Sequence, residues 1–192
     1  MTDPNFQIPT RRLIISYLQP DSDVHCDFLL ALYTSPEFIE FSGRTTMQTR
    51  DDVRELLAGR TRAEHARNGY GTYLFSLAAD GTPIGIVSLM QGEEPDRYGA
   101  PDLGFAILPA YMRQGYTKEA AARLLAYFDD KVGGRFEAFG LFDPQNVASG
   151  AVFRSLGFED RGIHELRVFG GVKGAVWARP GMSEDLKGVY KF

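Results

Sequence analysis

Hydrophobic and polar positions in the N-terminal part of the chain predict one strand followed by two helices. Residues 1–9 are polar with two prolines and predict a loose N-terminal arm. Residues 12–18 alternate with β-branched side chains and predict a strand. Asp21 or Ser22 then caps a helix that Pro36 ends. Its predicted apolar face is formed by four side chains, Val24, Phe28, Ala31 and Leu32. Thr49 with Asp52 predicts a capping box for a second helix that continues toward Arg67.

The middle of the chain predicts a meander and then a crossover. Strands over residues 72–79 and 83–90 are joined by Asp80-Gly81, a hairpin turn signal. Residues 102–108 are apolar on both faces and predict a central strand. A helix over residues 117–131 leads to a strand over residues 135–142, which we expect to be parallel to the strand before the helix.

The last part predicts one helix and one hairpin. Asn146 is a good N-cap, Gly157 stops the helix, and Ala148, Val152 and Leu156 form its expected apolar face. Residues 158–169 and 172–179 predict two strands joined by Gly170-Gly171. Periodicity alone therefore indicates a mixed α/β protein.

The loop between the central strand and the next helix has the chemistry of an anion site. Residues 112–117, Met-Arg-Gln-Gly-Tyr-Thr, lie where backbone N–H groups of a helix N-terminus lack partners. Converging donors and the helix dipole favour phosphate there. We therefore expect a long pyrophosphate-containing carrier, with its reactive end between strands.

Two sequence blocks carry a resemblance to a known family. The loop 112–117 resembles the acyl-CoA loop Gln/Arg-x-x-Gly-x-Gly/Ala of the GNAT N-acetyltransferase superfamily, with Gly115 matching and Met112 and Thr117 departing. Downstream, four residues are in register with the family's second block: Asn146, Ser149, Gly157 and Phe158. Residues 10–13, Thr-Arg-Arg-Leu, and 103–105, Leu-Gly-Phe, resemble the ribosomal-protein N-acetyltransferase (RimJ/RimL-like) branch.

The resemblance implies a fold and a cosubstrate. The expected fold is a single GNAT domain over residues 10–192, a mostly antiparallel mixed sheet splayed in the middle and flanked by helices, with its cofactor-binding core at about 101–158. Acetyl-CoA is the implied cosubstrate, and its pantetheine arm pairs with strand backbone. The implied backbone contacts are Phe105, Ile107 and Leu108, and an N–H of Ile107 or Leu108 also polarises the thioester carbonyl. The pyrophosphate is implied to rest on the loop residues Arg113, Gln114, Gly115, Tyr116, Thr117 and Lys118. Asn146, Ser149 and Phe153 complete the implied cosubstrate contacts.

Catalytic residues are harder to place. Many family members use a tyrosine as the acid, but Phe153 stands at that position and has no proton to donate. The branch implies Ser149 instead, which either hydrogen-bonds the sulfur or only packs beside the cosubstrate. Asp102 matches the strand glutamate of the histone-acetylating branch and is the first candidate base, unless it is an exposed turn residue after Pro101. Three further candidates are Glu93, Glu94 and His164.

Composition narrows the class of protein. A net charge of −4 gives no general nucleic-acid footprint. The three histidines and one cysteine show no metal-ligand spacing, so we expect no metal. Cys26 is expected to be a buried small hydrophobe. With no signal-peptide pattern and no membrane-length apolar run, a cytoplasmic protein is expected.

The sequence supports two classes of function. The first is acetyl transfer from acetyl-CoA to a primary amine, either a protein N-terminus or a small molecule, by direct attack in a ternary complex. Five side chains are candidates for the acceptor walls, namely Phe38, Phe41, Tyr70, Tyr98 and His164. The alternative is a non-catalytic acyl-CoA-binding or interaction domain with the same fold. Apolar residues over 177–192 would suit a homodimer contact.

Overall fold

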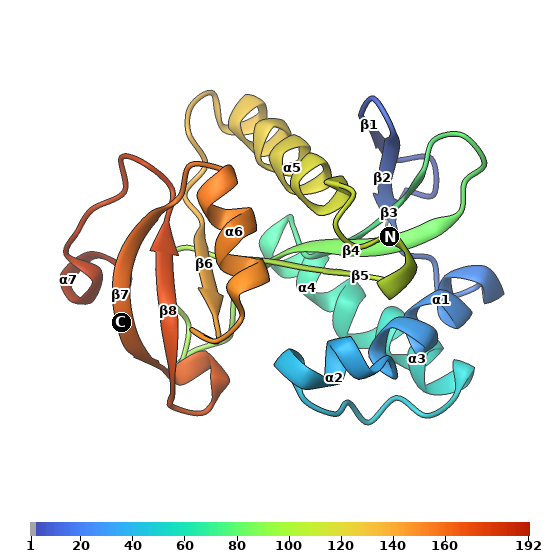
Figure 1. Ribbon diagram of the computed structural model, residues 1–192, viewed down its shortest axis with the longest axis horizontal. Coiled ribbons are helices and arrows are strands. Elements are labelled where there is room, and N and C mark those ends of the chain that lie inside the picture. Colours follow the sequence, from blue (N-terminus) through green and yellow to red (C-terminus); the bar gives the residue numbers. More distant parts are fainter. Residues whose placement is uncertain (1–2) are drawn as a thin grey trace. The chain divides into compact units, whose positions relative to one another are not determined.

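The computed structural model describes residues 3–192, which form two compact units (Figure 1). The first unit contains residues up to Ser88 together with residues 105–127, and the second contains residues 89–104 and 128–192. Strand β5 (Asp102–Ile107) and helix α5 (Tyr116–Val132) each contribute to both units. Residues 1 and 2 of the predicted arm lie outside the described residues.

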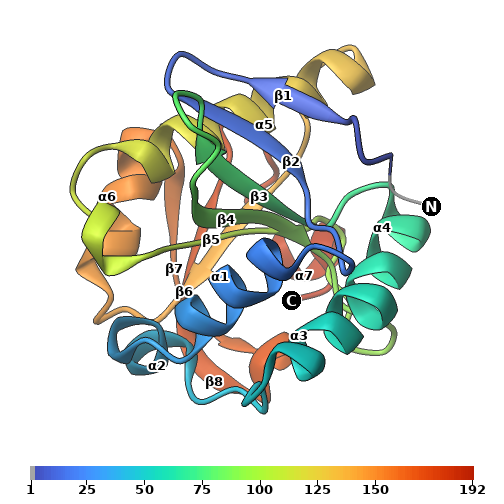
Figure 2. The ribbon, with the colours of Figure 1, turned by 90° about the vertical axis from the view of Figure 1, so that its right-hand side faces the viewer.

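Antiparallel strands dominate the sheet of the first unit (Figure 2). Its strand order is β1-β2-β3-β4-β5. The first four strands are β1 (Gln7–Pro9), β2 (Leu13–Tyr17), β3 (Thr72–Leu77) and β4 (Pro83–Met90). The Asp80-Gly81 turn is confirmed, because Gly81 has φ 76° and its N–H donates to Leu77 O. The prediction of a loose arm is wrong at Gln7–Pro9, where Ile8 is buried opposite Ile15. Pro9 is tolerated because β1 is an edge strand.

The helices of the first unit begin at the predicted caps. Ser22 caps α1 (Asp23–Tyr33), and the Thr49–Asp52 capping box starts α3 (Arg50–Leu56). The remaining elements are α2 (Pro36–Ser42), a π-helical turn (Leu57–Thr61) and α4 (Arg62–Asn68). Pro36 therefore starts a further helix as well as following α1.

The buried face of α1 differs from the predicted one. Its core side chains are Cys26, Phe28, Leu29 and Leu32, which pack in a cluster with Leu74 of β3 and Ile86 of β4. Val24 is 61% exposed and Ala31 is also exposed, so two of the four predicted face residues were wrong. Cys26 is fully buried as predicted.

The sheet of the second unit has the order β5-β6-β8-β7. Its strands after β5 are β6 (Phe139–Phe142), β7 (Glu159–Leu166) and β8 (Val172–Ala178). β5 and β6 are parallel, as the crossover through α5 predicts, and the other pairs are antiparallel. β6 is shorter than predicted, because Phe136 N donates to the Asp129 carboxylate and Arg179 donates to Phe136 O. Helix α6 (Val147–Ser155) precedes the predicted hairpin of β7 and β8.

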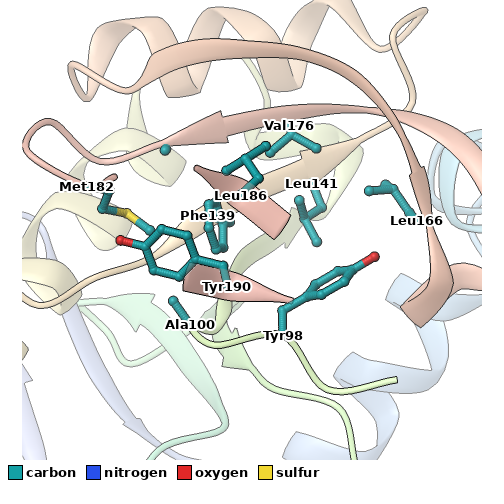
Figure 3. Packing of buried hydrophobic residues seen from close by; sticks show 10 residues of the cluster. Tyr98, Ala100, Phe139, Leu141, Leu166, Val176, Met182, Leu186 and Tyr190 are labelled. Carbon is teal, nitrogen blue, oxygen red and sulfur yellow. The ribbon is translucent and has the colours of Figure 1, made fainter. Parts of the chain in front are cut away.

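The C-terminal segment completes the core of its own unit. Helix α7 (Leu186–Tyr190) places Leu186 and Tyr190 in a buried cluster with Phe139 and Val176 (Figure 3). Met182 lies in the same cluster. These apolar side chains are therefore not available for contact with a second copy, and a homodimer stays a prediction. Within the described residues no helix has both the length and the apolarity to cross a bilayer.

Close packing at Gly140 gives a test of this core. A Cβ at Gly140 would lie 2.3 Å from Cε1 of Phe153, so we expect Gly140→Ala to lower the free energy of unfolding by about 1–3 kcal/mol. Urea denaturation measures this change. Gly134→Ala is the matched control, since nothing lies within 4 Å of its Cβ position. Equal stabilities of the two variants would contradict the packing.

Candidate functional site

The loop 112–118 combines left-handed backbone with unpaired donors. A short 3₁₀ turn (Pro109–Tyr111) follows β5, and Arg113 and Gly115 then have φ of 62° and 78°. The first helical hydrogen bond of α5 runs from Glu119 N to Gly115 O. Among residues 3–192 no atom accepts a hydrogen bond from the backbone N–H groups of residues 113–118. This run of donors therefore faces solvent at the start of α5.

The electrostatics of this loop favour an anion. α5 has 17 residues, and its N-terminal end carries the positive part of the helix dipole. Arg113 and Lys118 are exposed and add two positive charges. Free N–H groups, a helix N-terminus and flanking cations are together the features that hold phosphate groups. The loop therefore has the features of an anion site, and a pyrophosphate at this position stays a prediction.

Backbone alternation decides which edge of β5 each residue faces. Leu108 N donates to Ile84 O of β4 at 2.9 Å, whereas Pro101 O accepts from the N–H of Phe139, the first residue of β6, at 2.8 Å. Because successive residues of a strand direct their N–H and C=O groups to opposite edges, Phe105 and Ile107 face away from β4. The expectation for Leu108 was therefore wrong for its N–H, which β4 already uses, while Ile107 has the required direction.

Asp102 is buried at the start of β5. The residue is only 8% exposed, and its Oδ1 accepts a hydrogen bond from Leu141 N at 2.8 Å. Burial raises the pKa of this carboxyl to about 7, although the Leu141 hydrogen bond opposes the shift. The alternative of an exposed turn residue is therefore wrong. A carboxyl with a pKa near neutrality is suited to act as a general base.

The same carboxyl ends the pairing of β5 with β6. The two strands are in register through the single pair Asp102 and Phe139. Two residues further along β6, the Leu141 N–H bonds the Asp102 side chain instead of a backbone carbonyl of β5. The parallel ladder therefore has this single step, and the predicted splay of the two strands stays a prediction.

Helix α6 carries the second predicted block. Asn146 caps it as predicted, because its Oδ1 accepts from Ser149 N at 2.9 Å. Gly150 and Phe153 are its buried residues. Of the predicted face, Val152 and Leu156 are half-buried and Ala148 is exposed, so the prediction was wrong for Ala148 only. Ser149 is half-buried one turn before Phe153.

Phe153 has a packing role in the second unit. Its ring stacks on Phe142 with centroids 5.3 Å apart and contacts Phe158 at 5.1 Å. It is 2% exposed. The position at which many family members have a tyrosine is therefore occupied here by a buried phenylalanine that packs on aromatic rings. Contact of Phe153 with a cosubstrate stays a prediction.

The secondary candidates have other partners. His164 Nε2 lies 2.8 Å from Arg161 O, and Glu94 pairs with Lys191. Tyr98 is buried in the second core, where its hydroxyl accepts from Arg167 N, so it is not an exposed wall. Phe38 packs on the core of the first unit, and Phe41 is 42% exposed. In the part of the chain that the structure describes, no group of three His, Cys, Asp or Glu side chains is placed to hold a metal.

Comparison with protein families decides the assignment. The family model of the acetyltransferase (GNAT) domain matches residues 12–159. The chain belongs to the GNAT acetyltransferase family. The fold and the loop 112–118 agree with this assignment, and the acetyltransferase class expected from the sequence is confirmed.

Solved structures with the same fold include ribosomal-protein acetyltransferases. RimL, a ribosomal L7/L12 α-N-protein acetyltransferase in complex with coenzyme A, is 20% identical with a TM-score of 0.73, over 91% of this chain and 97% of that one. An acetyltransferase from Salmonella typhimurium that modifies the N-terminal serine of L7/L12 is 18% identical with a TM-score of 0.72, over 91% and 98%. The ribosomal-protein-S5-alanine acetyltransferase from Vibrio fischeri is 14% identical with a TM-score of 0.73, over 95% and 100%. No curated protein sequence matches the chain.

Burial of Asp102 has a measurable consequence for stability. Because its pKa in the folded protein is about 7, above the usual value of 3.8, its contribution to stability is complete below that usual value and is lost as pH rises through about 7. Asp102→Asn cannot ionise, so the free energy of unfolding of the native protein should fall relative to that of the variant between about pH 4 and about pH 8. Urea denaturation across this range checks it. Parallel pH profiles of the two proteins would contradict the raised pKa.

Proposed function

We propose that this GNAT acetyltransferase transfers the acetyl group of acetyl-CoA to a primary amine, by direct attack in a ternary complex. The observation that carries the proposal is the run of unpaired N–H groups over residues 113–118 at the start of α5. An anion-binding loop of this kind, in a chain of this family, supports a coenzyme A thioester as the donor.

The residues of the first unit fit the polar parts of this donor. We assign the pyrophosphate to the N–H groups of residues 113–118, which lack protein acceptors, and Arg113 and Lys118 supply charge. Ile107 directs its backbone groups to the edge of β5 away from β4, as pairing with an amide-rich arm requires. Contact of Phe105 with this arm stays a prediction. The Ile107 N–H is the donor that we assign to the thioester carbonyl oxygen, where negative charge develops during transfer.

Asp102 is the base in this proposal. A thioester supplies an activated acetyl group, but the attacking amine must be neutral and must lose a proton. With a pKa of about 7, the Asp102 carboxylate is present in large fraction near neutral pH and is basic enough to accept that proton through water. Ser149 is assigned a hydrogen bond to the departing sulfur. A thiolate, with an ordinary pKa of about 8.5, leaves without full protonation.

A peptide N-terminus is the first acceptor to test. RimL and the Salmonella typhimurium protein share the fold, and both are described as acting on the ribosomal protein L7/L12. A ribosomal substrate would place the enzyme in the cytoplasm. Small amines are the second class of acceptor.

Isothermal titration with acetyl-CoA tests cosubstrate binding. We expect micromolar affinity, and about a tenfold loss in Gly115→Val, because φ of 78° strains any side chain at this position and shifts the loop N–H groups. Gly81→Val is the matched control, since Gly81 has φ of 76° in the β3–β4 turn. No binding by the native protein would refute the proposal and favour an interaction domain.

Two substitutions of Asp102 separate its chemical role from its structural one. Asp102→Asn keeps an oxygen that can accept from Leu141 N, whereas Asp102→Leu removes it. We expect Asp102→Asn to lower kcat about 100-fold with little change in acetyl-CoA affinity, and to abolish the rise of kcat/KM through about pH 7. Steady-state rates on peptide amines between about pH 5 and about pH 9 measure both effects.

Asp102→Leu should lose stability in addition to turnover, because the buried Leu141 N–H is left without an acceptor. If Asp102→Asn keeps full turnover, Asp102 is not the base. If acetyl-CoA binds but neither variant nor native protein transfers acetyl to any amine, the chain is an acyl-CoA-binding domain.

A further inference from the structure

Three side chains connect the start of β2 to the start of α5. Thr10 Oγ1 donates to Glu119 Oε1 at 2.6 Å, and the backbone N–H of Arg12 donates to the same oxygen at 2.9 Å. Arg12 Nε donates to Glu119 Oε2 at 2.6 Å. Thr10 Oγ1 also accepts from Leu13 N at 2.8 Å. Both carboxylate oxygens of Glu119 are thus held by a turn more than 100 residues away in the sequence.

The guanidinium of Arg12 reaches beyond this ion pair into the loop 112–118. Arg12 Nη1 donates to Gln114 O at 3.0 Å, and the guanidinium carbon lies 4.4 Å from the centre of the Tyr116 ring. A Cβ at Gly115 would lie 3.6 Å from Arg12 Nη2. Arg12 therefore contacts Gln114 and Tyr116 and lies beside Gly115, which is between them.

Peptide geometry relates this contact to the exposed donors. In a trans peptide the C=O of one residue and the N–H of the next point in opposite directions. When Arg12 holds the Gln114 carbonyl, the N–H of Gly115 is directed away from Arg12. The positive φ values on both sides of Gln114 are compatible with this orientation.

The ion pair persists at neutral pH. Burial acts to raise the pKa of Glu119, but the hydrogen bonds from Thr10 and Arg12 outweigh it and hold the pKa below its usual value. The side chains of Arg12 and Glu119 are 38% and 20% exposed. Glu119 neutralises much of the charge of Arg12. Arg12 therefore orients the loop more than it attracts an anion.

We propose that Arg12 is a positioning residue that, with Thr10 and Glu119, sets the loop 112–118 in its phosphate-binding conformation. The inference rests on the proposed function, because the loop must bind the pyrophosphate of the cosubstrate. Lysine cannot replace arginine here, since Nε, Nη1 and the planar face of the guanidinium are used in three directions at once.

Titration calorimetry with coenzyme A tests this on the full chain. We expect Arg12→Lys to weaken coenzyme A binding about tenfold, although the charge is kept. Arg11→Lys is the matched control, because Arg11 is adjacent and exposed, and it should bind like the native protein. Glu119→Gln, which keeps acceptor oxygen but loses charge, should show a smaller loss.

Kinetics with two donors separate positioning from a general loss of structure. For Arg12→Lys we expect KM for acetyl-CoA to rise about tenfold with kcat within about twofold, and kcat/KM for S-acetylpantetheine, which lacks the pyrophosphate, to be unchanged. Equal losses with both donors, or unchanged coenzyme A affinity, would overturn the inference alone. Failure of the native protein to bind coenzyme A would overturn the proposed function and the inference with it.

Discussion

The hydrogen bond from the Leu141 N–H to the Asp102 carboxyl is the constraint on which the candidate catalytic chemistry depends. Buried N–H groups need acceptors, and in a parallel ladder a carbonyl of the neighbouring strand supplies one. Here the Asp102 side-chain oxygen takes that place, so the Leu141 N–H is satisfied without a carbonyl of β5. The burial that this arrangement requires is also what raises the pKa of Asp102. The same buried carboxyl thus satisfies the Leu141 N–H and has the raised pKa.

The loop after β5 also has backbone N–H groups that lack a backbone partner, but here no side chain replaces it. Its N–H groups have no protein acceptor over residues 113–118, but they are at the surface, where water satisfies them at little cost. A phosphate that replaces this water finds donors already oriented. Two sets of N–H groups near β5 therefore lack a backbone acceptor. The Leu141 N–H is buried and bonds the Asp102 carboxyl, whereas the N–H groups of residues 113–118 are exposed and can accept an anion as partner.

Local signals in the sequence were reliable because their causes are local. The caps at Ser22, Thr49 and Asn146 and the turn at Gly81 depend on residues within a few positions of each other. The buried faces of α1 and α6 were predicted less well, because the elements against which a helix packs decide which of its faces is buried. Phe153 is buried by contact with Phe142 and the side-chain-free Gly140, which no helical period reveals. β1 and α7 have three and five residues, so their patterns were too short to predict them. β1 forms by pairing with β2, and α7 packs against residues far away in the sequence, such as Phe139.

The candidate site shows the same division. Gly115 before a helix and Asp102 on a central strand were readable from the sequence, whereas the assignment of Leu108 required knowing that β4 takes its N–H. The contribution of Arg12 was unreadable, since Glu119 lies 107 positions away. In the proposed function the departures at Met112 and Thr117 from the family motif carry little weight. The proposed donors are backbone N–H groups, so the conformation of the loop matters more than these two side chains. That conformation depends on positive φ at Gly115 and on the Gln114 carbonyl held by Arg12.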